Sequence, residues 1–181
     1  MKIKPTPLKD CYVIEPAIVA DERGYFYEKF NEKKFEELTG LNGHFVQDNI
    51  SKSSYGVLRG IHLQKGEHAQ AKLVSCLEGR VFDVAVDLRE DSPTFGQWFG
   101  IELSDENKLQ LYVPRGFGHG FSVLSESAIF AYKCDNYYNN GSEGGILWKD
   151  IELNIDWKLP AEAIILSEKD KNLPKFSERN F

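Results

Sequence analysis

The sequence predicts an all-β domain, because short segments of alternating side-chain character recur along the chain and only one stretch is typical of a helix. The expected strands follow one another closely and are separated by Gly, Pro, Asn and Ser residues. A chain with this pattern folds as a β-sandwich, a jelly roll or a barrel. The residues alone leave these three architectures open.

The clearest strand is expected over residues 80–88. Large apolar residues alternate there with smaller or acidic ones, and this period of two indicates one apolar face and one mixed face. The two sets are Phe82, Val84, Val86 and Leu88 against Val81, Asp83, Ala85 and Asp87. Because the mixed face carries two carboxylates, we expect it to be wet, either inside an open barrel or against bulk solvent.

Other segments repeat this alternation at shorter length. Strands are expected over residues 96–103, 109–113 and 129–132. The one predicted helix covers residues 31–38: Asn31 can cap its start, Phe35 and Leu38 share a face, and Gly40 can end it.

Length and composition restrict the class of protein. The 181 residues, of which 41% are hydrophobic and 28% charged, fit one soluble domain that spans residues 1–181. A formal net charge of −6 argues against a nucleic-acid partner, which normally meets a basic face. No apolar run resembles a signal peptide or reaches the roughly 20 residues that cross a bilayer. Three well-separated cysteines predict reduced, buried thiols in a cytoplasmic protein.

The first group of candidate functional residues contains Arg59, His62 and Lys72. Arg59 and Lys72 stand among apolar residues, so we expect both cations to project from strands. Such a cation can hold a phosphate or stabilise a developing oxyanion, but it can also be an ordinary surface charge. A single histidine such as His62 is equally compatible with a structural role.

Two further groups lie later in the chain. Glycines surround His119, which permits a close backbone approach to a ligand or merely a tight bend. Tyr132, Tyr137 and Tyr138, followed by Glu143, can stack on a base or sugar and donate a phenolic proton, although tyrosines also suit a β-core.

Several chemistries lack a matching pattern in the sequence. The four histidines at positions 44, 62, 68 and 119 contain no His-x-His pair, so we expect no metal site. The sequence also has no Gly-x-Ser-x-Gly elbow, phosphate-binding P-loop or Gly-x-Gly-x-x-Gly opening a helix. Hydrolysis by a serine nucleophile, ATP use and dinucleotide binding therefore have no support.

Seven segments, none specific by itself, carry a resemblance when taken in order. They are residues 21–24, 45–49, 56–62, 70–74, 83–89 with 92–96, 114–121 and 166–170. Together they resemble the dTDP-4-dehydrorhamnose 3,5-epimerase family over about residues 3–174. The resemblance implies a cupin-type double-stranded β-helix, or jelly-roll barrel, with short peripheral helices, no metal and no cofactor. It also implies a homodimer that exchanges N-terminal strands.

The resemblance assigns four catalytic residues. His62 would remove the protons at C3 and C5 of a dTDP-linked 4-keto-6-deoxyhexose, and Asp170 would orient its ring. Lys72 would stabilise the enolate oxygen, and Tyr132 would return a proton to the opposite face of the sugar. These roles suit the chemistry, because a proton beside a ketone requires a base near neutral pKa and a cation at the carbonyl oxygen.

The resemblance also assigns the residues that bind the nucleotide or sugar, with Phe26 and Tyr138 expected to sandwich the base. The whole set is Arg23, Phe26, Glu28, Gln47, Asn49, Arg59, His119, Tyr138, Glu143 and Lys169. Alternatives to a 3,5-epimerase are a 3- or 5-mono-epimerase of another deoxysugar, a ketoisomerase and a non-catalytic jelly roll that binds nucleotide sugars.

Overall fold

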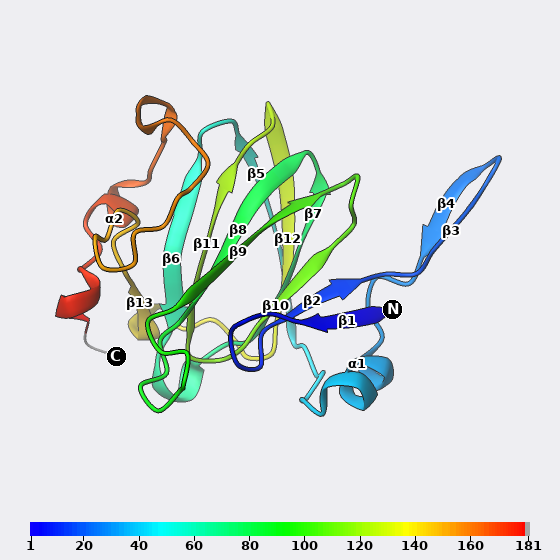
Figure 1. Cartoon of the computed structure of the whole chain (residues 1–181), viewed down its shortest axis with the longest axis horizontal. Coiled ribbons are helices and arrows are strands. Elements are labelled where there is room, and N and C mark those ends of the chain that lie inside the picture. Colours follow the sequence, from blue (N-terminus) through cyan, green and yellow to red (C-terminus); the bar gives the residue numbers. More distant parts are fainter. Residues whose placement is uncertain (180–181) are drawn as a thin grey trace.

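Two antiparallel β-sheets lie face to face in the computed structural model of the chain, which describes residues 1–179 (Figure 1). The larger sheet has six strands in the order β1-β2-β10-β7-β12-β5. Their bounds are β1 Lys2–Pro5, β2 Tyr12–Glu15, β10 Gln110–Val113, β7 Lys72–Glu78, β12 Ser127–Cys134 and β5 Gln47–Ser54. The prediction of an all-β jelly roll is confirmed.

The second sheet has five strands in the order β13-β6-β11-β8-β9. Apolar side chains from β7, β8, β11 and β12 fill much of the space between the two sheets. The bounds are β13 Glu143–Gly145, β6 Leu58–Gln64, β11 Phe117–Val123, β8 Arg80–Asp87 and β9 Trp98–Ser104.

The predicted helix exists and begins and ends as its caps require. α1 covers Glu32–Thr39; the Asn31 side chain accepts from the Lys34 N–H at 3.0 Å, and Gly40 is left-handed at φ 71°. Phe35 is buried but Leu38 is exposed, so the expected shared face is not a buried one. The remaining helices are short: α2 Glu168–Lys171 and the 3₁₀ turns Gly66–His68, Asn140–Ser142, Ala161–Ala163 and Phe176–Glu178.

The prediction that the mixed face of β8 is wet is wrong. Asp83 and Asp87 are both 0% exposed. The face that carries them packs between the sheets, and the other face is covered by the C-terminal segment that includes Trp157. Each carboxylate has a partner: Asp83 meets His119 of β11, and Asp87 accepts bonds from the guanidinium of Arg89, two residues further along the sequence. The alternation identified the strand, but the packing of other elements against both of its faces decided its environment.

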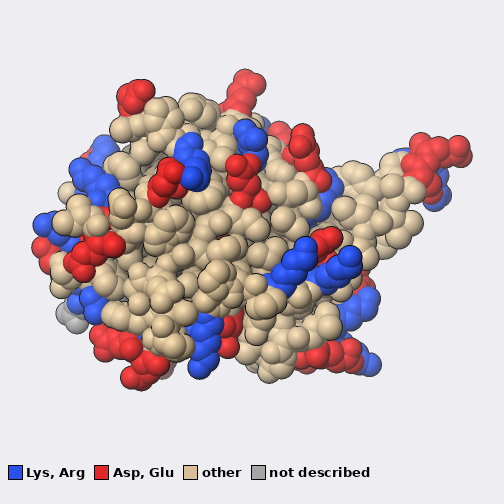
Figure 2. Space-filling model, viewed as in Figure 1, with Lys and Arg blue, Asp and Glu red and all other residues tan. Residues whose placement is uncertain are grey.

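A two-stranded hairpin, β3 Ile18–Asp21 and β4 Gly24–Tyr27, projects away from both sheets (Figure 1). Figure 2 shows charged side chains at its tip and uncharged ones along its length. Val19 is 67% exposed and Phe26 is 72% exposed, so apolar surface on the hairpin faces outward in the single chain. Within residues 1–179, no helix combines the length and the apolar composition that crossing a bilayer needs.

Candidate active site

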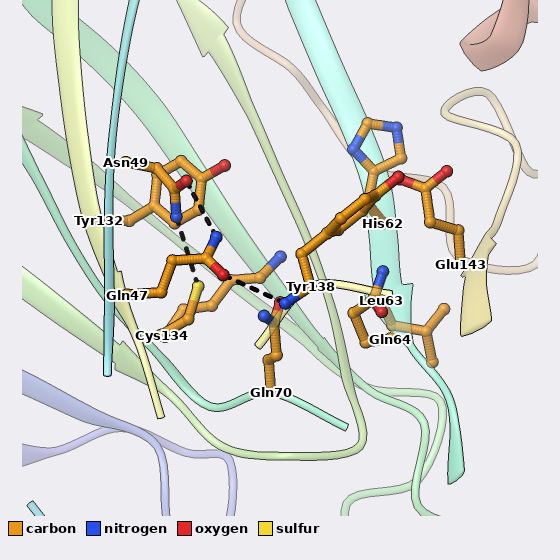
Figure 3. Close-up of a pocket in the computed structure, with 11 residues that line it drawn as sticks. Gln47, Asn49, His62, Leu63, Gln64, Gln70, Tyr132, Cys134, Tyr138 and Glu143 are labelled. Atoms are coloured by element: carbon orange, nitrogen blue, oxygen red, sulfur yellow. Dashed lines mark hydrogen bonds between the residues drawn. The ribbon is translucent and has the colours of Figure 1, made fainter. Parts of the chain in front are cut away.

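The candidate active site lies between the sheets, where β6 of one sheet faces β7 and β12 of the other. These strands supply His62, Lys72 and Tyr132 respectively. All three side chains line two adjoining cavities of about 280 and 160 Å³. In Figure 3, His62 and Tyr132 stand on opposite sides of the larger cavity, with the Tyr132 hydroxyl directed across it. The three residues therefore face one common space.

The strands on either side of β6 determine where His62 lies. His62 pairs with His119 of β11 on one side and with Gly145 of β13 on the other. A Cβ atom at Gly145 would lie 2.4 Å from the Ile61 carbonyl oxygen, so only glycine lets β13 approach β6 this closely. The local sequence thus fixes the strand from which the imidazole projects.

Asp170 holds the His62 ring from outside the sheet. The His62 Nε2 atom lies 2.5 Å from Asp170 Oδ1, and Asp170 is almost fully buried. Ser167 caps α2 and accepts from the Asp170 N–H at 3.1 Å, which places the carboxylate on the helix's first turn. Burial alone would raise the pKa of Asp170, but hydrogen bonds with His62, Ser167 and the Gly60 backbone outweigh it and lower that pKa. An ionised Asp170 accepts the Nε2 proton and leaves Nδ1 as the basic nitrogen.

Lys72 and Tyr132 are arranged as a cation and an acid on the facing wall. The Lys72 Nζ atom lies 6.0 Å from the centre of the Tyr132 ring. Burial lowers the pKa of the Lys72 ammonium, although nearby acidic groups partly oppose the shift. Burial raises the pKa of the Tyr132 phenol, so this side chain keeps its proton at neutral pH. A base, a cation and a proton donor around one cavity suit removal and return of a proton beside a carbonyl group.

His119, which was predicted to bind substrate, is a buried residue of β11. Its ring lines the smaller cavity, stacks on Phe130 and has Nε2 2.9 Å from Asp83 Oδ1. Burial lowers the pKa of His119 despite the neighbouring carboxylate, which favours the neutral ring. Within residues 1–179, Asp83 Oδ2 has no hydrogen-bond partner. The alternation in residues 80–88 predicted on which face of the strand Asp83 lies, but it could not identify His119 as the partner of that carboxylate.

Most of the predicted substrate-binding residues surround the same cavities. Gln47, Asn49, Tyr138 and Glu143 line the larger cavity. Arg59 lines the smaller one and donates from Nε to Ser53 Oγ at 3.2 Å. Lys169 forms an ion pair with Glu143, and a third hollow of about 360 Å³ joins Arg59, His62, Lys169 and Asp170.

Three predicted binding residues lie outside these cavities. Arg23 and Phe26 belong to the β3–β4 hairpin and line a separate surface hollow, where Arg23 forms an ion pair with Asp21 at 2.5 Å. Glu28 follows the hairpin and accepts from Lys34 at 2.7 Å. The fold of a single chain does not bring these residues to His62.

Some residues of the larger cavity were not predicted to be functional. They are Leu63, Gln64, Gln70 and Cys134. Cys134 was identifiable in principle, because it stands two residues after Tyr132 on one strand and so shares its face. In residues 1–179, no group of three or more His, Cys, Asp or Glu side chains is arranged to hold a metal ion.

Comparisons with known proteins place this geometry among relatives. The sequence profile described as dTDP-4-dehydrorhamnose 3,5-epimerase matches residues 5–178. A Shigella flexneri dTDP-4-dehydrorhamnose 3,5-epimerase is 52% identical over 181 residues, which are 100% of this chain and 99% of that protein.

Two crystal structures show a close similarity of fold. The dTDP-4-dehydrorhamnose 3,5-epimerase of Elizabethkingia anophelis NUHP1 superposes with a TM-score of 0.98 at 73% identity, covering 100% of this chain and 99% of that one. The dTDP-6-deoxy-D-glucose-3,5-epimerase of Legionella pneumophila Philadelphia 1, in complex with dTDP-4-keto-L-rhamnose, has a TM-score of 0.94 at 52% identity. That match covers 99% of this chain and 94% of the Legionella chain.

Proposed function

This chain belongs to the dTDP-4-dehydrorhamnose 3,5-epimerase family, and from that premise we propose that His62, Asp170, Lys72 and Tyr132 form its catalytic centre. The protein is an isomerase that converts dTDP-4-dehydro-6-deoxy-D-glucose into dTDP-4-dehydro-L-rhamnose by inverting C3 and C5. The observation that best supports the residue assignment is the His62–Asp170 pair facing Tyr132 and Lys72 across one cavity.

His62 acts as the base. With the Nε2 proton shared with Asp170, its free Nδ1 takes the proton from the carbon next to the C4 ketone, and the ring becomes an imidazolium. The buried carboxylate of Asp170 stabilises that positive charge and fixes the tautomer. A positioned base of this kind accounts for about 10²–10⁴-fold in rate.

Lys72 stabilises the charge that forms on the substrate. When the C–H bond breaks, its electron pair moves into the ring and the C4 carbonyl oxygen becomes an enolate oxygen. The ketone itself accepts the electron pair, so neither an oxidant nor a cofactor is needed for this step. An ammonium in a buried wall is more effective than one in water, because the low local dielectric strengthens its attraction for the oxyanion.

Tyr132 completes the inversion. Its protonated phenol gives a proton to the carbon from the face opposite His62, and the enolate returns to the ketone. The two residues must stand on opposite sides of the sugar, because return of the proton by His62 would restore the original configuration. The imidazolium then loses its proton to solvent and the phenolate takes one up, so both groups are ready for inversion of the second carbon.

The nucleotide and sugar are held by the side chains around the cavities. Gln47, Asn49, Arg59, Tyr138 and Glu143 are the assigned contacts in the same protomer, together with His119 and Lys169. Arg23, Phe26 and Glu28 are proposed to act in trans in a homodimer, with the projecting hairpin of one protomer reaching the site of its partner. The exposed apolar surface on the hairpin supports this arrangement, since a dimer interface would bury it.

A cytoplasmic location is part of the proposal. Support comes from three cysteines that are all buried and all free of disulfide bonds, as expected of a protein in a reducing compartment. Cell fractionation followed by immunoblotting tests this location directly.

The activity is tested by incubating the protein with dTDP-4-keto-6-deoxy-D-glucose in heavy water and following C3 and C5 by NMR. We expect deuterium at both carbons and accumulation of the L-lyxo ketone. Label at one carbon would identify a mono-epimerase instead. Binding of the nucleotide sugar without label at either carbon would contradict the catalytic assignment and favour a binding protein.

A further inference from the structure

A chain of hydrogen bonds runs through one wall of the larger cavity and ends at Cys134 (Figure 3). The Tyr138 backbone N–H donates to Gln47 Oε1 at 3.1 Å, and Gln47 Nε2 donates to Asn49 Oδ1 at 3.0 Å. Asn49 Nδ2 then donates to the Cys134 Sγ atom at 3.7 Å. This chain of hydrogen bonds thus connects the loop that carries Tyr138 with strands β5 and β12.

The direction of this chain is fixed at its Tyr138 end. A backbone N–H can only donate, so Gln47 must turn its carbonyl oxygen toward Tyr138 and its amide nitrogen toward Asn49. Asn49 must then present its oxygen to Gln47 and its nitrogen to Cys134. Rotation of either carboxamide by 180° would bring two donors or two acceptors face to face.

Cys134 is suited to close the chain as an acceptor. It is buried on β12, opposite Gln47 in the strand pairing and two residues beyond Tyr132. Burial raises the pKa of the Cys134 thiol to about 11, so at neutral pH the sulfur is a neutral, weak acceptor and not a thiolate that would compete for Lys72. In this role Cys134 acts as a hydrogen-bond acceptor and not as a nucleophile.

The fixed direction decides what the wall offers to a ligand. Both carboxamide oxygens are engaged within the chain, and each amide nitrogen uses one of its two N–H groups there. Among residues 1–179, the second N–H of Gln47 and of Asn49 has no protein partner, and both residues line the cavity. This wall therefore presents free N–H donors to whatever part of the substrate it meets.

We propose that Cys134 is a positioning residue whose sulfur ends the Tyr138–Gln47–Asn49 chain and so keeps this wall selective for an acceptor-rich group such as the diphosphate of a nucleotide sugar. The inference rests on the proposed function, because it assigns a part of that substrate to this wall. Cys134 itself need not touch the substrate.

The test replaces Cys134 with two residues of nearly equal shape. Cys134→Thr keeps an acceptor on the same branch, whereas Cys134→Val puts a methyl group in its place. We expect Cys134→Val to weaken dTDP binding and raise KM about two- to tenfold, the range for one lost hydrogen bond, with kcat within twofold. Cys134→Thr should keep both constants near the wild-type values. Binding of dTDP is measured by calorimetry, separately from turnover.

Cys76→Val is the matched control, since it removes another buried thiol, which donates to the carbonyl oxygens of Glu78 and Gly79 at the far end of β7. It should lower the melting temperature without changing dTDP affinity. Equal losses of affinity in Cys134→Val and Cys134→Thr, or none in Cys134→Val, would overturn the positioning role. If either variant is too unstable for kinetics, the side-chain amide signals of Asn49 in ¹H–¹⁵N spectra at low temperature decide. They should shift in Cys134→Val and stay near their wild-type position in Cys134→Thr, and no difference between the two would overturn the proposal.

These outcomes are separate from failure of the proposed activity. A wild-type protein that binds dTDP but does not label the sugar in heavy water would contradict the epimerase assignment. The comparison of Thr and Val at position 134 would still test the hydrogen-bond chain, because it is read from dTDP affinity.

Discussion

The Nε2 atom of His62 lies 2.5 Å from Oδ1 of Asp170, a carboxylate that is only 3% exposed. The pKa of Asp170 is lowered, because its hydrogen bonds with His62, Ser167 and the Gly60 N–H outweigh the effect of burial. A carboxylate that stays ionised beside the ring holds the Nε2 proton and stabilises an imidazolium. This arrangement suits acceptance of a proton at Nδ1, and the predictions for the other proposed catalytic residues follow from it.

Removal of the base should separate binding from chemistry. We expect His62→Ala to abolish solvent exchange at both C3 and C5, with a loss of at least about 10²-fold in rate, while dTDP affinity stays within a few fold. Deuterium incorporation and calorimetry measure the two quantities. Exchange retained at the wild-type rate would remove His62 from the role of base.

Loss of the phenol should separate proton removal from inversion. Tyr132→Phe keeps the ring beside Lys72 and Phe130 but has no proton to donate. We expect the variant to exchange the substrate's protons with heavy water yet form the L-lyxo ketone poorly. NMR measures exchange and product in the same sample, and unaltered product formation would rule out Tyr132 as the donor.

The pH dependence of turnover should report on Lys72. Burial lowers the pKa of its ammonium below the ordinary value of 10.5, whereas the pKa of the Tyr132 phenol is raised above 10.0. As pH rises, Lys72 loses the proton that stabilises the oxyanion, so kcat should fall on the alkaline side at a pH below the ordinary lysine value. Lys72→Met should cut kcat by about 10²–10³-fold and remove this limb. An unchanged alkaline limb in that variant would assign it to another group.

A shared site should permit complementation between inactive chains. Phe26→Ala is expected to impair substrate binding through the hairpin, and His62→Ala removes the proposed base, so each variant alone should have little activity. Mixed dimers should recover up to about half of the sites if the hairpin of one protomer serves its partner. Activity after co-expression of the two variants measures this recovery. No recovery in a mixture shown to contain heterodimers would contradict action in trans.

The buried Asp87 should matter for stability and not for chemistry. Burial tends to raise its pKa, but hydrogen bonds from Arg89, Ser92 and Thr94 outweigh burial, so the folded pKa lies below the ordinary 3.8. The stabilisation is complete above the unfolded value and is lost as pH falls through the lower folded value. We expect Asp87→Asn to cost about 3 kcal/mol of unfolding free energy near neutral pH.

Urea titrations at several pH values measure this cost, which should shrink only under strongly acidic conditions. Asp156→Asn is the control, because its ion pair with Lys158 is exposed and should contribute little. A similar effect of both substitutions would argue that burial of Asp87 is not the cause.

Local patterns were enough to predict the elements that hold the site. Alternation over residues 80–88 predicted β8, and Asn31 and Gly40 predicted the two ends of α1, because these signals depend on neighbours along the chain. The same alternation led to the wrong prediction that Asp83 and Asp87 are exposed to water. Whether a carboxylate on a strand is wet or buried depends on what the rest of the fold packs against it. His119 of β11 reaches Asp83, and Arg89 with Ser92 and Thr94 from the following loop bonds to Asp87.

The sequence by itself determined that the chain is a β-domain, which family it resembles and which residues are candidates for catalysis, since residue order and spacing carry that information. Only the tertiary structure decided that Asp170 meets His62 at Nε2, that Cys134 ends a chain of amides, and that Arg23 and Phe26 lie apart from the cavity of their own chain. The physical reason is that hydrogen bonds and burial act between side chains whose separation in space is set by the packing of the two sheets.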